Sequence, residues 1–176
     1  MNKYIGHFKT ITKHKWYVFH ACRKSGILWR GITHDLSKYS FAEFMASAKF
    51  FNGTKSPIGV EKEKFGYSKA WAHHKGRNSH HWEHWTDFAR GEMYCMKMPI
   101  TDLKELLCDW IGAGKAYNKE KWNEEEAANY YYDRRDKMFF HEETRMLLEE
   151  ALTVLRLEGE ESYYRFVKEL NYESVN

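Results

Sequence analysis

Apolar side chains recur at helical spacing along most of this chain, and only two prolines interrupt the pattern. In the first helix, predicted over residues 3–24, Tyr4, Ile11 and Val18 share one apolar stripe. No apolar run approaches the ~18 residues that a membrane-spanning helix needs. With 176 residues, the chain is predicted to form a single all-α domain over residues 1–176, a compact bundle of roughly seven or eight helices.

Capping residues and turn formers set the predicted helix boundaries. Ser40 and Glu43 have the spacing of a capping box, and Pro99 suits the first turn of a helix. Residues 52–67 are polar and hold three glycines and a proline, so they are predicted to be a surface loop. A helix from Ser68 is expected to continue to about Ala89, with Gly76 permitting a bend. The other helices are predicted from about residue 27 to 35, over 40–51, after Pro99 to Tyr117, from about 123, over 141–157 and over 160–170.

Charge and cysteine content narrow the classes of function. A net charge of +3 is small for a nucleic-acid binder that works by neutralising phosphates, so nucleic acid is not the expected partner. The three cysteines show no CxxC spacing, which disfavours both a disulfide framework and a thiolate zinc site and fits a reducing cytoplasm. The basic N-terminus lacks the apolar core of a signal peptide. A cytoplasmic protein without a membrane segment is predicted, and its oligomeric state stays open.

Histidines are unusually frequent, and their spacing resembles that of metal ligands. Of ten histidines, five lie between His73 and His84. Imidazole combined with carboxylate suits divalent transition metals such as Mn, Fe, Co, Ni or Zn. Isolated histidines can also be hydrogen-bonded core residues, but the repeated occurrence of ligand-type residues favours metal binding. The predicted ligands are His14 on the apolar stripe, the pair His34 and Asp35, His73 or His74, His80 or His81, and Asp109.

Asp109 is the most informative single residue among these candidates. It lies in the apolar segment ELLCDWIG, where a carboxylate is costly to bury unless it is paired or bound to metal. Glu105 lies one helical turn earlier and could support a ligand through a hydrogen bond. Lys38 follows the His34–Asp35 pair by about one turn, where its ammonium could hold a phosphate oxygen.

The order His14, His34–Asp35, Asp109 resembles the ligand order of the HD-domain superfamily, which consists of all-α, metal-dependent phosphohydrolases. Lys38 and the histidines from His73 to His81 make the chain similar to the two-metal branch of that superfamily, although its Gly-Tyr-Pro loop is replaced here by HHWEHWTD. The resemblance implies either one metal ion or two metal ions that Asp35 bridges. Lys38, and also Arg77 or Lys115, would then bind the substrate phosphate, while Asn78, Glu83 and Glu105 would orient ligands.

A closer likeness extends over nearly the whole chain. The strings HDLSKYS, GYSKAWAHHKGRNSHHWEHW and KMPITDLKELLCDWIGAGKAY resemble an uncharacterised family of small bacterial and phage proteins, which brings no known reaction with it. From the resemblance to the HD-domain superfamily, we expect a hydrolase in which Asp35 and Lys38 are catalytic. Its expected substrate is a nucleotide or related phosphate ester, either a monoester or a diester. The alternative is a non-catalytic helical module that is stabilised by metal and binds a protein or nucleic-acid partner.

Overall fold

The computed structural model describes residues 2–175 and confirms the prediction of a compact helical bundle. Within that range the chain forms nine α-helices and one small antiparallel hairpin, which the sequence did not predict. The α-helices are α1 (Lys3–Lys24), α2 (Leu28–Thr33), α3 (Phe41–Phe50), α4 (Pro57–Phe65), α5 (Lys69–Arg77), α6 (Ile100–Asn118), α7 (Glu125–Tyr132), α8 (Glu142–Glu158) and α9 (Glu160–Glu169), and the strands are β1 (Thr86–Ala89) and β2 (Glu92–Cys95).

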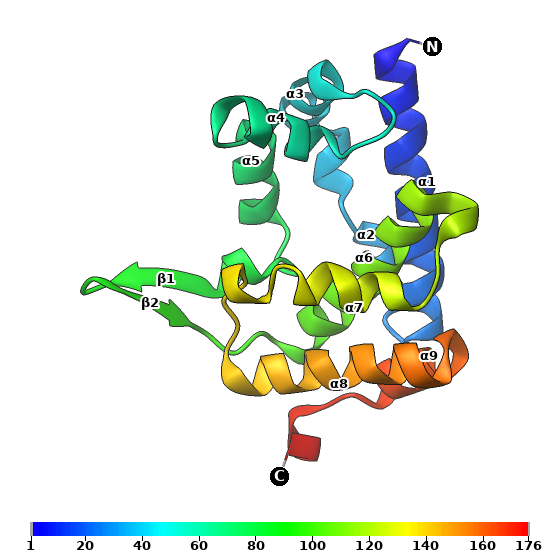
Figure 1. Ribbon diagram of the computed structural model, residues 1–176, viewed down its shortest axis with the longest axis vertical. Coiled ribbons are helices and arrows are strands. Elements are labelled where there is room, and N and C mark those ends of the chain that lie inside the picture. Colours follow the sequence, from blue (N-terminus) through cyan, green and yellow to red (C-terminus); the bar gives the residue numbers. More distant parts are fainter. Residues whose placement is uncertain (1, 176) are drawn as a thin grey trace.

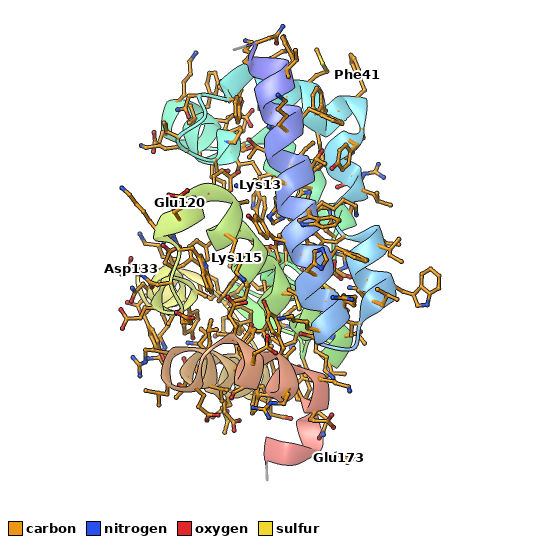
Figure 2. The ribbon with its side chains drawn as sticks, turned by 90° about the vertical axis from the view of Figure 1, so that its right-hand side faces the viewer. Lys13, Phe41, Lys115, Glu120, Asp133 and Glu173 are labelled. Atoms are coloured by element: carbon orange, nitrogen blue, oxygen red, sulfur yellow. The ribbon has the colours of Figure 1, made fainter. Side chains whose placement is uncertain are left out.

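The helices form two groups that are joined by the long helix α1 (Figure 1). Helices α3, α4 and α5 lie together at the N-terminal end of α1, and α8 and α9 cross its C-terminal end. Helix α6 packs along α1, and the main core lies between these two helices and α8, with Val18, Leu107 and Leu148 fully buried. Figure 2 shows α1 crossing the face of the molecule, with Phe41 projecting outward at the start of α3.

Helices α1 and α6 approach each other closely at Gly112. A Cβ atom at Gly112 would come within 3.0 Å of the backbone nitrogen of Val18. Any larger residue would therefore push the two helices apart. His14 lies about one turn before Val18 on α1, and Asp109 lies about one turn before Gly112 on α6, so this contact also sets the separation of two predicted ligands.

The predicted loop over residues 52–67 was wrong, because its middle forms helix α4. Pro57 occupies the first turn of α4, where a missing backbone N–H has no cost, and Gly66 ends the helix with a positive φ of 79°. The proline and the glycines that indicated a loop therefore mark the two ends of a short helix. Its last four residues are exposed, and one of its two buried residues is Glu61, which left only a weak apolar pattern to detect.

The predicted long helix over residues 68–89 was also wrong. Helix α5 ends at Arg77 rather than bending at Gly76, because Asn78 adopts extended backbone angles while its side-chain Nδ2 donates a 2.8 Å hydrogen bond to the carbonyl of His74. Strands β1 and β2 follow, with Thr86 opposite Cys95. Arg90 and Gly91 both have positive φ, as a tight two-residue hairpin turn requires. Among the described residues, no helix combines the length and apolarity needed to cross a membrane.

We predict that Gly112→Ala destabilises the protein by about 1–3 kcal/mol, because the added methyl group overpacks the contact between α1 and α6. The matched control is Gly59→Ala in α4, where a Cβ would meet no atom within 4 Å. That substitution should be neutral or stabilising by up to about 1 kcal/mol, since alanine favours a helix more than glycine does. Urea unfolding of both variants measures the difference. Equal free energies of unfolding for the two variants would contradict the close approach.

Candidate metal centre

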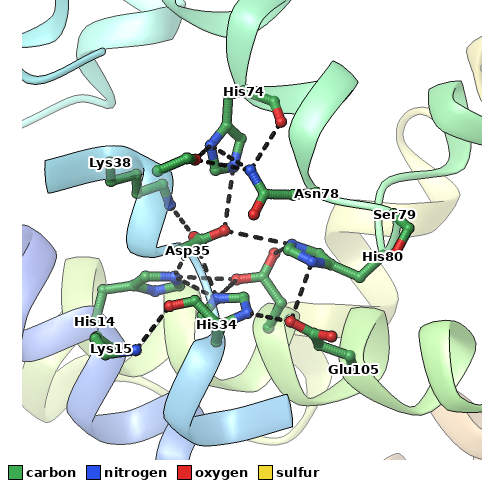
Figure 3. Close-up of polar contacts among 12 residues, drawn as sticks. His14, Lys15, His34, Asp35, Lys38, His74, Asn78, Ser79, His80 and Glu105 are labelled. Carbon is green, nitrogen blue, oxygen red and sulfur yellow. Dashed lines mark hydrogen bonds and ion pairs between the residues drawn. The ribbon is translucent and has the colours of Figure 1, made fainter. Parts of the chain in front are cut away.

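Seven side chains from separate segments meet in one buried cluster, part of which is shown in Figure 3. Helix α1 supplies one of them, the segment after α2 two, α5 one, the turn after α5 two, and α6 one. All seven are at most 8% exposed, which is rare for charged and polar residues unless they are paired or bind metal. They are His14, His34, Asp35, His74, His80, His81 and Asp109.

Asp35 lies at the centre, and its two carboxylate oxygens face different histidines. Oδ2 lies 3.1 Å from Nε2 of His34 and 3.5 Å from Nε2 of His14. Oδ1 lies 3.2 Å from Nε2 of His74 and 3.6 Å from Nε2 of His80. A carboxylate in this position can bridge two cations, one on each side.

Two groups of potential ligands share this carboxylate. One group consists of His14, His34, Asp35 and Asp109, and the other of Asp35, His74, His80 and His81. Within each group the ligand atoms lie within 4.8 Å of one another. In the first group, Nε2 of His14 lies 3.0 Å from Oδ1 of Asp109 and 3.3 Å from Nε2 of His34. The structure thus brings together residues that are separated by up to 95 positions in the sequence.

The chemistry of the second group fits a bound cation. Among the described residues, the buried Nε2 atoms of His74, His80 and His81 have no hydrogen-bond partner. Buried nitrogen atoms are normally paired, because leaving one unpaired costs about 1–3 kcal/mol. A divalent ion would accept their lone pairs and would also balance the carboxylate of Asp35. The buried histidine and aspartate groups could therefore hold metal ions, and imidazole favours a transition metal.

The electrostatics keep the carboxylates charged. Burial alone would raise the pKa of Asp35, but His34, Lys38 and His74 outweigh burial and hold that pKa well below its usual value. The pKa of Asp109 is likewise lowered, because contacts with His14 and His34 overcome burial. Both side chains are therefore acceptor-only carboxylates at neutral pH, the form that binds a cation.

The protonation of His81 is set by burial. Burial lowers its pKa well below the usual value, and the neighbouring imidazoles of His80 and His74 lower it further. His81 is therefore neutral at physiological pH and has a lone pair available for a cation. Its ring lies 4.1 Å from that of His80, centroid to centroid. Two imidazoles this close repel each other when both are protonated, which favours metal over protons in this group.

Glu105 holds one histidine of each group. Its Oε1 accepts hydrogen bonds from Nδ1 of His34 at 2.8 Å and from Nδ1 of His80 at 3.2 Å. These bonds fix both Nδ1 atoms as the protonated nitrogens and leave both Nε2 atoms facing Asp35. Its Oε2 lies 2.5 Å from Nε of Arg30, which also pairs with Asp102. The sequence-based prediction placed Glu105 next to a ligand, and the structure places it next to two.

Glu43 performs the same task for His74, although the sequence analysis assigned it only to helix capping. Its backbone N–H does donate to Oγ of Ser40, but the carboxylate does not complete the capping box. Instead Oε2 accepts from Nδ1 of His74 at 2.9 Å and from Oγ of Ser37 at 3.0 Å, while Oε1 accepts from Nδ1 of His73. Glu43 is 2% exposed, and its only signal in the sequence was its spacing from Ser40, which a capping box explains equally well.

The backbone around Asp35 is unusual and is held from α1. Asp35 has a left-handed conformation with φ 53°, which few residues other than glycine, asparagine and aspartate adopt readily. Nζ of Lys15 donates hydrogen bonds to the carbonyls of Ile32 and His34 at 2.7 and 2.8 Å. These bonds tie the end of α2 to α1, and so they fix where His34 and Asp35 point (Figure 3).

Three residues that the sequence analysis proposed lie away from the cluster. His73 belongs to neither ligand group within the described residues and instead bonds to Glu43 and Arg77. Arg77 is exposed, and its Nε donates to Nε2 of His73. Lys115 pairs with Glu160 at 2.6 Å and stacks on Trp122. His73 and Arg77 lie four residues apart on one face of α5, about 100° around the helix from His74, so their side chains point away from the cluster.

Asn78 and Glu83, predicted to orient ligands, have different positions. Nδ2 of Asn78 lies 2.9 Å from Oγ of Ser37 and 3.1 Å from Nδ1 of His74, directly beside the cluster. Glu83 accepts a 3.2 Å hydrogen bond from Nε1 of Trp71, whose ring packs against the rings of His74 and His81. Glu83 therefore acts on the histidines through Trp71 and does not contact them.

A cavity of about 580 Å³ opens above the cluster and reaches its side chains. His14, Lys38, His74, His81 and Asp109 lie on its floor. The volume falls in the range of about 300–1,000 Å³ that is typical of pockets for small-molecule ligands. The cluster is thus buried from bulk solvent but accessible to a small molecule.

His7 is a cavity residue that the sequence analysis missed. It is 5% exposed, its ring packs against Phe44 and Phe51, and burial together with Lys38 lowers its pKa to about 4. It precedes His14 by two helical turns on the same face of α1, and this spacing was the signal that could have found it.

Comparison with known protein families identifies a family whose model matches most of the chain. The model of a family of unknown function, DUF5662, matches residues 3–154. This agrees with the expected likeness to an uncharacterised family. No curated protein and no solved structure matches the chain, so the likeness to the HD-domain superfamily stays a prediction.

We predict that Asp35→Asn lowers bound metal from about two ions per chain to fewer than one, because a single carboxylate serves both ligand groups. Asparagine tolerates the left-handed backbone, so the variant should still fold. His14→Ala, which affects only the first group, should retain about one ion. Mass-spectrometric metal analysis after loading with Mn²⁺ or Zn²⁺ measures the content. Full occupancy in Asp35→Asn would exclude a bridging role.

We further predict that Glu105→Gln weakens metal binding by at least about tenfold, because a neutral amide oxygen accepts from the two imidazole N–H groups more weakly than a carboxylate and the amide NH2 group would face the guanidinium of Arg30. The matched control is Glu149→Gln on α8, whose carboxylate accepts from Tyr131 and does not contact the cluster. Calorimetric titration with Zn²⁺ compares the two variants. Equal affinities would show that Glu105 has no part in orienting the ligands.

Proposed function

The chain belongs to DUF5662, a family of unknown function, and we propose that it is a metal-dependent phosphohydrolase acting on a small phosphate ester. The observation that carries this proposal is the pair of ligand groups that share Asp35 at the floor of a cavity. A purely structural metal site needs no cavity above it, whereas a catalytic site must remain accessible to its substrate. The order of the ligands, similar to that of the HD-domain superfamily, supports the same reaction class.

The two groups would hold one or two divalent transition ions. His14, His34, Asp35 and Asp109 are the proposed ligands of one ion, and His74, His80 and His81 join Asp35 for the other. When bound, such ions supply Lewis-acid polarisation of a phosphoryl oxygen and activation of an attacking water. Glu105 and Glu43 keep the histidine Nε2 atoms directed at the centre through hydrogen bonds to the opposite ring nitrogens.

Lys38 is the proposed phosphate-binding residue. Its Nζ lies 2.5 Å from Oδ2 of Asp35, and its side chain lines the cavity. Burial alone would lower the pKa of Lys38, but the carboxylates of Asp35 and Asp109 raise it above the usual value. The ammonium therefore stays charged and can neutralise negative charge that develops on the phosphoryl oxygens. Asp35 is the proposed catalytic carboxylate because it belongs to both ligand groups and also pairs with Lys38.

We predict that Lys38→Ala retains its metal and loses hydrolysis by at least about tenfold, because the ammonium contacts phosphate and is not a metal ligand. The matched control is Lys115→Ala, since Lys115 pairs with Glu160 outside the cavity. A panel of phosphate monoesters and diesters, assayed with added Mn²⁺, measures the rates, and metal analysis measures the content.

The same panel separates catalysis from a structural role for the metal. Hydrolysis that depends on Mn²⁺ and on Lys38 supports the enzyme. If the wild-type protein binds metal tightly but cleaves no ester, the metal is structural and the proposed reaction is wrong. Loss of metal from Lys38→Ala would refute the role assigned to the ammonium.

A further inference from the structure

We propose that the cavity above the cluster is built for a phosphate ester whose organic group is uncharged and carries an aromatic ring, and that it discriminates against substrates with a longer phosphate chain. This inference rests on the proposed function and specifies the substrate of that site. It is carried by two features of the cavity walls, namely their aromatic residues and their distribution of charge.

The walls beyond the floor include four large aromatic residues. Trp71 on α5 forms part of one wall, and Trp110 and Tyr117 on α6 and Tyr130 on α7 form part of another. The Trp110 and Tyr130 rings pack edge to face, with centroids 5.3 Å apart, so their orientation is fixed. Tyr117 is 40% exposed and shows no ring contact with another described side chain. Aromatic side chains of this kind bind a planar ring by stacking.

The positions of the cavity-lining residues on helix α6 indicate how far the cavity extends from the cluster. Asp109, Ala113 and Tyr117 line it at successive turns, so Tyr117 lies two turns, or roughly 12 Å, from Asp109 along the helix axis. A phosphate at the floor therefore leaves space for an organic group about the size of a nucleoside between the floor and Tyr117. A phosphate ion by itself would leave most of the 580 Å³ unfilled.

The charges along the walls do not suit additional phosphates. Of the lysine and arginine side chains that the structure describes, only those of Lys38 and Arg134 line the cavity. Lys38 lies at the floor against Asp35. The Arg134 guanidinium stacks on Tyr130 at 4.5 Å from the ring centroid and donates to the Tyr130 carbonyl at 3.1 Å. Triphosphate sites normally surround each phosphate with several donors or cations, which these walls lack.

Glu126 makes the far end of the cavity unfavourable for an anion. This residue of α7 lines the cavity and accepts a hydrogen bond from Nδ2 of Asn118, at the end of α6. No described lysine or arginine side chain forms an ion pair with it. A second or third phosphate extending from the floor toward this end would approach an uncompensated carboxylate. An uncharged ring would not experience that repulsion and would gain contact with the aromatic walls.

Equilibrium binding to the Mn²⁺-loaded protein tests the proposal. The probes are thiophosphate analogues of AMP, ADP and ATP, which resist hydrolysis, and a thiophosphate analogue of glycerol phosphate, which has no ring. Free Mn²⁺ is held constant with a metal buffer so that the ATP analogue cannot strip the ions. We expect the AMP analogue to bind about tenfold or more tightly than the glycerol analogue, as the loss of a stacked base predicts. The ATP analogue should bind about tenfold more weakly than the AMP analogue, because of repulsion at short range.

Two pairs of variants assign the effects to the two features. Glu126→Gln should strengthen binding of the ATP analogue by about threefold or more and leave the AMP analogue unchanged, whereas Glu125→Gln, which is exposed and outside the cavity, should change neither. Tyr117→Leu should weaken binding of the AMP analogue by about threefold or more and spare the glycerol analogue. Tyr132→Leu, exposed on α7 and outside the cavity, is its control.

The outcomes distinguish this proposal from the proposed function. An ATP analogue that binds as tightly as the AMP analogue, or a glycerol analogue that matches it, overturns the substrate class even if ester hydrolysis is observed. Hydrolysis of no ester overturns the proposed reaction, whereas the order of affinities still decides what the cavity binds. Unchanged affinities in both Glu126→Gln and Tyr117→Leu would show that neither wall feature selects the ligand.

Discussion

The buried carboxylate of Asp35 is the interaction on which the rest of the site depends. A single negative charge in the interior is too costly to leave alone, and here it is surrounded by four histidines and one lysine. The four histidines come from α1, the end of α2, α5 and the turn that follows it, so four parts of the chain must be positioned relative to one carboxylate. The left-handed backbone at Asp35 is the local consequence, because it directs the side chain into the bundle rather than along the surface.

The cluster is supported from outside by two further carboxylates and by one close helix contact. Glu105 and Glu43 each accept from the outer nitrogens of two imidazoles, and Arg30 and Asp102 extend the first of these networks to the surface. Gly112 lets α1 and α6 approach closely enough for His14 and Asp109 to meet. A polar network in a low-dielectric interior is stable only when nearly every member is paired. Where three unpaired nitrogens lie together, at Nε2 of His74, His80 and His81, a cation could bind.

The cavity above the cluster separates two tasks. Its floor is charged and built from the ligand-bearing segments, whereas its walls are largely aromatic and come in part from α7, which contributes nothing to the cluster. Chemistry and substrate choice can thus depend on different residues. This division explains why Arg77 and Lys115, which carry the right charge for phosphate, are engaged elsewhere: they lie near the site in sequence but on surfaces that do not face the cavity.

Local patterns in the sequence were sufficient for the helical fold and for the selection of His14, His34, Asp35 and Asp109, because each of these is marked by its immediate neighbours, as an inward position or as a carboxylate in an apolar helix. Glu105 was found for the same reason. Only the tertiary structure decided that His74, His80 and His81 face Asp35 while His73 turns outward, and that Glu43, His7 and Arg134 line the site. Helical periodicity predicts the direction of a side chain only while the helix continues. Helix α5 ends before Asn78, whose side chain donates a hydrogen bond to the carbonyl of His74, and this end changes the direction of every side chain that follows. Convergence from separate helices depends on where each helix stops and on how closely it packs, and local patterns in the sequence marked neither the end of α5 nor the close contact at Gly112.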